Sequence, residues 1–168
     1  DHLDNNCNGQ IDEGFVHPPA TVTPSGNVSV CTGANLVLTA NTGAGFTYKW
    51  FKDGIHISGA TTSSYSVTVA GTYTVEVTTS SGCSTTSTAT TVAIFASPTA
   101  TISPNTSVTI CSGQKTTLTA NSGSGLTYQW LNDGSNISGA TSKTYKASVQ
   151  GNYKVKVTNS SGCSTTSS

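Results

Sequence analysis

Ser80-Ser81-Gly82-Cys83-Ser84-Thr85-Thr86-Ser87 occurs twice in this chain, because the same letters return unchanged at positions 160–167. The same offset relates Trp50 to Trp130 and Cys31 to Cys111. Aligned over 20–88 and 100–168, the two copies are identical at roughly half of their positions and need no gap. Self-similarity at a fixed period is typical of an array of one structural unit. The sequence therefore predicts an acidic N-terminal loop (1–19), repeat 1 (20–97) and repeat 2 (98–168).

Composition narrows the class of protein. Only 8% of the 168 residues are charged, none is Arg or Met, and Ser and Thr make up roughly a third of the chain. The formal net charge is zero, which argues against nucleic-acid binding because phosphate contacts need clustered cations. No apolar run approaches the ~20 residues that span a membrane. The chain begins at Asp1 without a signal peptide, and we interpret it as a mature product or a fragment.

Short runs of β-branched and aromatic residues, separated by Gly, Asn and Ser, predict strands. Alternation assigns their inward faces, since successive side chains point to opposite sides of a strand. No segment has a helical period, and the predicted fold class is therefore an all-β sandwich. The strands expected in repeat 1 are 21–30, 36–40, 46–51, 65–69, 72–78 and 84–95. The residues expected to point inward are Leu36, Leu38, Ala40, Phe46, Tyr48, Trp50, Tyr73, Val75 and Val77.

Three patterns give the chain a family resemblance: Cys31-Thr-Gly33 before Leu-x-Leu, Tyr48-x-Trp50, and Gly71-x-Tyr73-x-Val75. Together they resemble an immunoglobulin-like or PKD-like domain, and most closely the tandem Ig-like repeats of large secreted and surface proteins of Bacteroidota. The resemblance implies two tandem immunoglobulin-like β-sandwich domains, a buried strand-C Trp and a tyrosine corner at Tyr73. One departure is that the positions of the antibody-type disulfide hold Ala40 and Val75, so packing must hold this core.

Five cysteines in such a chain indicate an oxidising, extracellular or cell-surface location. One pairing joins Cys31 to Cys83 and Cys111 to Cys163 within the repeats. However, the resemblance places Cys31 and Cys83 at opposite ends of a sandwich. The alternative is a ladder between neighbouring domains, in which Cys31 meets Cys163, Cys83 meets Cys7, and Cys111 awaits a further domain. Free thiols are the third possibility.

Repeat 2 stops at Ser168, before the equivalent of the last strand of repeat 1. Either the chain is cut from a longer protein, or a partner supplies the strand by β-augmentation.

The N-terminal loop is the one stretch with the chemistry of a metal site. Its alternating oxygen donors around Gly9 follow the first part of an EF-hand-type loop, although Phe15 stands where the closing Glu would be. The stretch also resembles the short metal-binding repeats of the D-x-x-D-N-D-C-D-G-x-x-D-E type in secreted bacterial proteins. Hard oxygen donors favour Ca²⁺, while another metal such as copper would need His2, His17 or Cys7. The remaining alternative is a plain acidic turn. The candidate ligands are Asp1, Asp4, Asn6, Asn8, Gln10, Asp12 and Glu13.

Catalysis is not expected, because no metal-protease, phosphate-loop or redox motif occurs and His56 becomes Asn136 in repeat 2. Copies with identical spacing favour a non-catalytic stalk, filament or adhesin shaft, stiffened by disulfides and Ca²⁺. Its partners would be neighbouring repeats or copies of itself. The loop is acidic and repeat 2 carries five lysines against Asp133. The lysines either solvate exposed strand faces or attract the acidic end of a neighbouring copy head to tail. The alternatives are a module that binds cell-surface glycan or protein, and an accessory region of a larger secreted enzyme.

Overall fold

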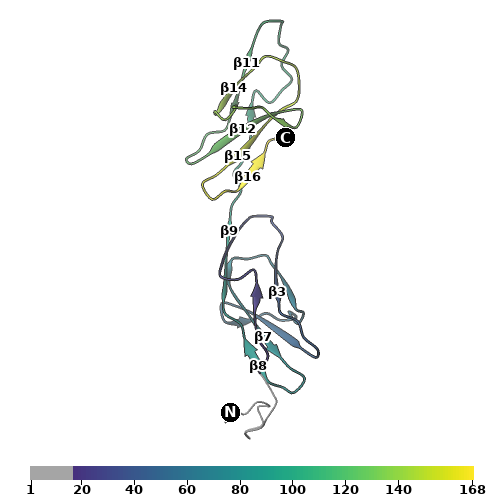
Figure 1. The fold of residues 1–168 in the computed structure, drawn as a ribbon. Helices are drawn as coiled ribbons and strands as arrows, with labels where there is room; N and C mark the ends of the chain where they lie inside the picture. The colour runs from purple at the N-terminus through teal and green to yellow at the C-terminus, as the bar shows by residue number, and fades with distance from the viewer. Residues whose placement is uncertain (1–16) are drawn as a thin grey trace. The chain divides into compact units, whose positions relative to one another are not determined.

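The structure is a computed structural model that describes residues 17–168, and within them every regular element is a β-strand. The chain divides into two compact units, with the boundary between Ile94 and Phe95 (Figure 1). The all-β expectation is confirmed.

Repeat 1 folds into two sheets. One has the strand order β1-β3-β6, and the other has the order β2-β9-β7-β4-β5, with β8 also paired to β7. Six pairs of neighbouring strands are antiparallel: β1–β3, β3–β6, β4–β5, β4–β7, β7–β8 and β7–β9. The strands are β1 (Val22–Thr23), β2 (Asn27–Cys31), β3 (Leu36–Ala40), β4 (Thr47–Lys52), β5 (Ile55–His56), β6 (Ser64–Val67), β7 (Gly71–Thr78), β8 (Ser84–Thr86) and β9 (Thr90–Phe95).

The core of repeat 1 lies between these two sheets, where alternate residues of each strand meet. Leu38 from β3, Trp50 from β4 and Val75 from β7 are fully buried at 0% exposure. The Trp50 indole donates its Nε1 hydrogen to the carbonyl of Thr62 at 2.9 Å, which satisfies the one polar group of this side chain. The inward faces predicted from alternation are confirmed. The partly buried members of those faces, Leu36, Phe46 and Tyr48, pack around the buried centre.

Repeat 2 has the same plan with fewer strands. Its sheets have the orders β10-β11-β14 and β13-β12-β15-β16, and Trp130 is buried in its core beside Val155 and Val157. The Trp130 indole donates to the carbonyl of Ser142 at 2.9 Å, as in repeat 1. The strands are β10 (Ile102–Ser103), β11 (Thr116–Ala120), β12 (Thr127–Asn132), β13 (Ser135–Asn136), β14 (Thr144–Ala147), β15 (Tyr153–Thr158) and β16 (Ser164–Thr166).

The strand predicted over 21–30 is wrong in one respect, because it is two strands in different sheets. β1 pairs with β3, whereas β2 lies beside β9. Pro24 has no N–H to continue the first ladder, and Gly26 has a φ of +76°, a conformation that glycine adopts without strain. These two residues let the chain change sheets.

The strand predicted over 84–95 is also divided, and both halves pair with β7. β8 lies against Glu76–Thr78, and β9 lies against Gly71–Tyr73. Between them, Ser87 replaces the regular ladder: its hydroxyl oxygen accepts from the N–H of Val75 at 3.1 Å, and its own N–H donates to the Val75 carbonyl at 2.9 Å. Because the side chain of Ser87 accepts a hydrogen bond that a backbone carbonyl would accept in a regular ladder, the pattern of apolar and polar residues does not reveal this break. The short strand β5 was not predicted either.

Candidate functional site

The predicted metal ligands Asp1, Asp4, Asn6, Asn8, Gln10, Asp12 and Glu13, with Cys7, lie outside the described residues. Within residues 17–168, no three His, Cys, Asp or Glu side chains are grouped so that they could hold a metal ion. The metal site therefore stays a prediction from sequence.

The cysteines of the repeats are not equivalent to one another. Cys31 and Cys163 are disulfide-bonded, whereas Cys111 is an exposed thiol. Cys83 is buried, with 1% exposure. Since Cys111 is a thiol and Cys163 is bonded, the predicted pairing of these two within repeat 2 is wrong.

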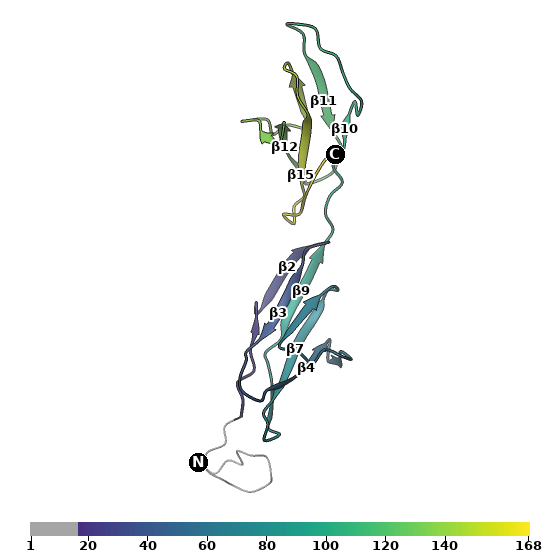
Figure 2. The ribbon, with the colours of Figure 1, turned by 90° about the vertical axis from the view of Figure 1, so that its right-hand side faces the viewer.

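The topology of repeat 1 also separates Cys31 from Cys83. β2 and β9 run side by side in the same direction (Figure 2), and Thr91 N donates to the Gly26 carbonyl at 2.8 Å where both begin. β9 is antiparallel to β7, so Cys31, which ends β2, lies toward the start of β7. Cys83 follows the end of β7, and the eight residues of that strand span about 26 Å. A disulfide needs Cα atoms about 4.4–6.8 Å apart, and Cys31 and Cys83 cannot form one.

The turn before Cys163 is fixed by Asn159, which the sequence analysis missed. Its side-chain oxygen accepts from the N–H groups of Ser161 and Cys163 at 3.1 and 3.0 Å, and its amide donates to the Ala96 carbonyl at 2.9 Å. The Cys163 sulfur lies 3.7 Å from the carbonyl oxygen of Phe95. Asn159 thus ties the turn that carries Cys163 to the segment that opens the second compact unit.

Repeat 1 has Thr79 at the position of Asn159. Its hydroxyl donates to the Cys83 carbonyl at 3.3 Å and contacts the Ser81 hydroxyl at 2.8 Å, so it closes its own turn. The signal in the sequence is the substitution of this one residue immediately before an octapeptide that is otherwise repeated unchanged.

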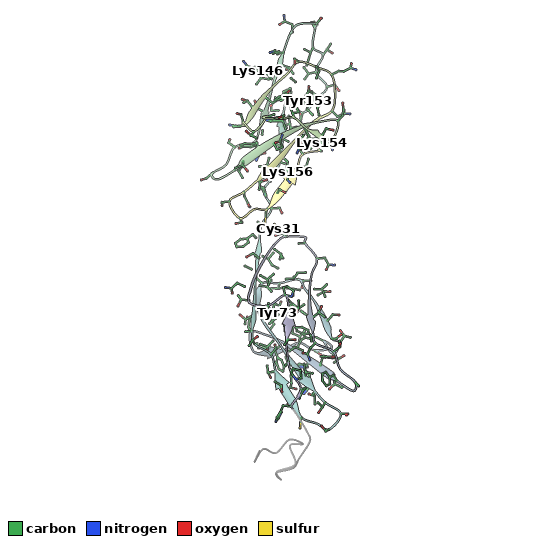
Figure 3. All side chains as sticks on the ribbon, in the orientation of Figure 1. Cys31, Tyr73, Lys146, Tyr153, Lys154 and Lys156 are labelled. Carbon is green, nitrogen blue, oxygen red and sulfur yellow. The ribbon has the colours of Figure 1, made fainter. Side chains whose placement is uncertain are left out.

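The aromatic residues of repeat 1 that were predicted to point inward belong to the core. Trp50 and Tyr73 are 0% and 1% exposed, and Tyr65 lies between them with ring centroids 5.9 and 5.7 Å away. Tyr73 donates its hydroxyl hydrogen to the Val69 carbonyl at 2.7 Å, and Tyr153 donates to that of Val149 at 2.9 Å. These bonds confirm the tyrosine-corner expectation (Figure 3).

Burial raises the pKa of the Tyr73 hydroxyl, and the neighbouring Tyr65 adds to the effect. The pKa of Tyr153 is raised for the same main reason, with Tyr145 as the neighbour. The raised pKa values extend to higher pH the range in which both hydroxyls stay protonated and donate to the backbone carbonyls.

The two aspartates of the repeats, Asp53 and Asp133, serve the backbone. Asp53 has a φ of +51° and accepts from the N–H of Thr72 at 2.8 Å; Asp133 has a φ of +48° and accepts from that of Asn152 at 2.9 Å. The hydrogen bond from Lys52, followed by that from Thr72, lowers the pKa of the Asp53 carboxyl. Each Asp thus pins its hairpin turn to the start of the next long strand.

The outer faces of the repeats differ in chemistry. In repeat 1, Lys49 and Glu76 form an ion pair at 3.1 Å, and the ring of Phe51 lies 5.6 Å from that of His56 on the β4–β5 hairpin. In repeat 2, Lys156 stands opposite Gln129 on the neighbouring strand, and Lys154 opposite Leu131. A feature that changes from copy to copy is not a site shared by both repeats.

Comparisons with known proteins find one family model and several solved structures to which this chain is similar. Residues 18–98 match the family model described as Ig-like domain, CHU_C associated. Repeat 1 is immunoglobulin-like. The fibronectin(III)-like modules of CbhA from Clostridium thermocellum superpose with a TM-score of 0.46 at 18% identity, over 89% of this chain and 90% of that one. Murine CEACAM1b superposes with a TM-score of 0.39 at 18% sequence identity, over 89% of this chain and 95% of that one. An I-band fragment of titin superposes with a TM-score of 0.41 at 14% sequence identity, over 90% of this chain and 64% of the fragment.

A comparison with curated proteins finds none that matches. Within residues 17–168, no helix is long and apolar enough to cross a membrane.

Proposed function

We propose that the chain is a non-catalytic structural or adhesive segment of an extracellular protein, in which immunoglobulin-like repeats form a stalk, filament or shaft. The observation that carries the proposal is the state of the cysteines: Cys31 and Cys163 are bonded although Cys111 is a thiol. A further support is that the buried aromatic residues of both repeats serve packing, and Asp53 and Asp133 serve turns.

The pairing that fits these observations is Cys31 with Cys163, the first rung of the predicted ladder. A disulfide between successive domains would remove freedom at the junction, and a string of repeats would become a stiff rod. The second rung, Cys7 with Cys83, involves a residue outside the described part of the chain and stays a prediction. Persistent disulfides are typical of secreted and cell-surface proteins, which is the location we propose.

Peptide mapping under non-reducing conditions is expected to recover a cross-linked pair of peptides that contain Cys31 and Cys163. A Cys31→Ser variant should release Cys163 as an alkylatable thiol, while a Cys111→Ser variant, the matched control, should leave the cross-linked pair intact. Recovery of a Cys31–Cys83 peptide pair would contradict both the ladder and the strand placement of repeat 1.

We also propose that the N-terminal loop binds Ca²⁺ through its carboxylate and amide oxygens. Calcium titration calorimetry on the whole chain is expected to show one saturable site, and an Asp4→Asn, Asp12→Asn double variant should weaken binding at least about tenfold, because ligand charge sets affinity in such loops. An Asp133→Asn variant is the control, since that carboxylate serves a turn in repeat 2. Equal affinity of the double variant and the native chain would remove calcium from the proposal.

The second candidate function is recognition of a surface glycan or protein by repeat 1. The observation in its favour is the β4–β5 hairpin, where Phe51 and His56 lie beside Ile55, which is 74% exposed. Repeat 2 has Leu131, Ser135 and Asn136 at these positions, so such binding would belong to one repeat only.

A further inference from the structure

The lysines of the two repeats differ in their partners. The ion pairs formed within residues 17–168 join Lys49 to Glu76 and Lys52 to Asp53, and both lie in repeat 1. Repeat 2 has five lysines, all of them exposed, and a single carboxylate, that of Asp133. Repeat 1 is therefore neutral, whereas repeat 2 has a net charge of +4 with no ion pair among the described residues.

The fold does not require this excess of positive charge. Both repeats form a sandwich of two sheets around a buried Trp, yet every lysine of repeat 2 stands where repeat 1 has a neutral or an acidic residue. Unpaired like charges also repel one another and slightly lower the stability of a folded domain. The lysines are Lys115, Lys143, Lys146, Lys154 and Lys156, and their counterparts in repeat 1 are Asn35, Ser63, Ser66, Thr74 and Glu76.

Two of these lysines lie on one rigid surface. Lys154 and Lys156 alternate along β15 with the buried residues Val155 and Val157, so both point away from the core on the outer face of their sheet (Figure 3). Two residues along a strand span about 7 Å. The ladder between β15 and β12 is six residue pairs long and fixes this spacing.

The residues that face these two lysines from the neighbouring strands are neutral. Gln129 and Leu131 on β12 stand opposite Lys156 and Lys154, and Thr166 on β16 stands opposite Lys156 on the other side. The Gln129 amide is held by the backbone, since it donates to two main-chain carbonyls at 2.9 Å each. We call the outer surface formed by these five residues the lysine face.

The complementary charge is in the chain itself. Residues 1–14 carry four carboxylates, those of Asp1, Asp4, Asp12 and Glu13, and no lysine. The zero net charge of the chain is thus divided among an acidic segment of −4, a neutral repeat and a basic repeat of +4. We propose that the lysine face of repeat 2 docks the acidic segment, residues 1–14, of a second copy of this chain.

The proposed contact is reversible. Exposed ion pairs are individually weak, so one contact is sensitive to salt and gains strength where several copies are held together and bind at several points. The inference goes beyond the proposed stalk, because it gives each copy a charge-driven contact with another copy that needs no disulfide. Peptide mapping of Cys31 and Cys163 tests the stalk independently of it.

Sedimentation velocity of the whole chain over a range of concentrations tests the docking. All chains carry Cys111→Ser so that this exposed thiol cannot cross-link copies, and a chelator keeps all four carboxylates of the acidic segment free of metal. Association is expected at about 0.01 M salt, where the Debye length is about 30 Å, and should weaken strongly at about 0.15 M, where it is about 8 Å.

Two double variants locate the surface. Lys154→Thr with Lys156→Gln removes both cations of the lysine face and should lower the association constant about tenfold or more. Lys143→Ser with Lys146→Ser is the matched control: it removes the same charge and introduces the residues of repeat 1, but Lys146 lies on β14, in the other sheet. The control should change the association constant less than about threefold.

An exchange of charges gives the decisive measurement. A chain with Lys154→Glu and Lys156→Glu, and a chain with Asp4→Lys and Asp12→Lys, should each stay monomeric alone and associate when mixed, since each segment then meets a face of opposite charge. A native chain that stays monomeric at low salt, equal loss in both lysine variants, or no association in the mixture would overturn the inference. Retention of a monomeric chain on a sulfated polysaccharide through Lys154 and Lys156 would also overturn it, because the face would then serve an outside polyanion.

Discussion

Replacement of Trp50 by Ala is expected to unfold repeat 1 while repeat 2 stays folded. Trp50 is fully buried and its Nε1 hydrogen bonds to the Thr62 carbonyl. Truncation of a buried Trp lowers the free energy of unfolding by about 3–5 kcal/mol. The Thr62 carbonyl, left without its hydrogen-bond donor, lowers it by about 1 kcal/mol more. Domains of this size have a free energy of unfolding of about 5–15 kcal/mol and lie near the lower end of that range. Most or all of the stability of repeat 1 would be lost.

The chain has two tryptophans, one in each core, and the measurement exploits this. In the Trp50→Ala variant, all tryptophan fluorescence comes from Trp130 and should keep the blue-shifted emission of a buried indole. Hydrogen exchange at β3 and β7 should become fast. Trp130→Ala is the reciprocal variant, and Trp50→Phe, which keeps most of the volume and loses only the indole donor, should have an intermediate effect. Retention of native exchange in β3 and β7 would show that this tryptophan does not hold the core together.

The part of the fold that could be predicted from sequence is the part set by alternation and by repetition. The strand over Leu36–Ala40 was predicted with its observed bounds, because its apolar residues alternate without interruption. Tyr73, Val75 and Val77 were placed inward for the same reason, and all three are buried. The 80-residue offset then carried each assignment into the second repeat.

The errors arose where a strand changes its partner. Residues 21–30 carry apolar or small side chains at alternate positions across Pro24, and residues 84–91 are all Ser, Thr or Ala. Neither pattern shows that the chain moves from one sheet to the other at Pro24, or that Ser87 interrupts the ladder beside Val75. Such changes depend on which strand lies alongside. That is a property of the assembled sandwich, and residues near in sequence do not report it.

For the cysteines, too, one part could be predicted and another could not. The family resemblance implied that Cys31 and Cys83 lie at opposite ends of repeat 1, and the strand order places them far apart. Asn159 was missed because its role depends on the carbonyl of Ala96, which is 63 residues away in sequence.

The second large effect is expected from Val92→Asp, which should release β9 from repeat 1 without unfolding the rest. Val92 is 2% exposed, and a carboxylate there must either be buried, protonated or expelled, at a cost of several kcal/mol. Local opening is the cheapest response, because β9 pairs with β7 over only three residue pairs and can detach together with β2 as a unit. Trp50 contacts the core through the β4–β7 ladder, which pairs over six residues and should survive the opening.

In the Val92→Asp variant, the loss of protection against hydrogen exchange is therefore expected to be local. Protection should be lost at β2, at β9 and at residues 71–72, and kept in the β4–β7 ladder around Trp50. Thr91→Asp is the matched control: it lies one residue away on the exposed side of the same strand, and its effect on stability should stay within about 0.5 kcal/mol. Loss of protection throughout repeat 1 would mean that β9 is inseparable from the core.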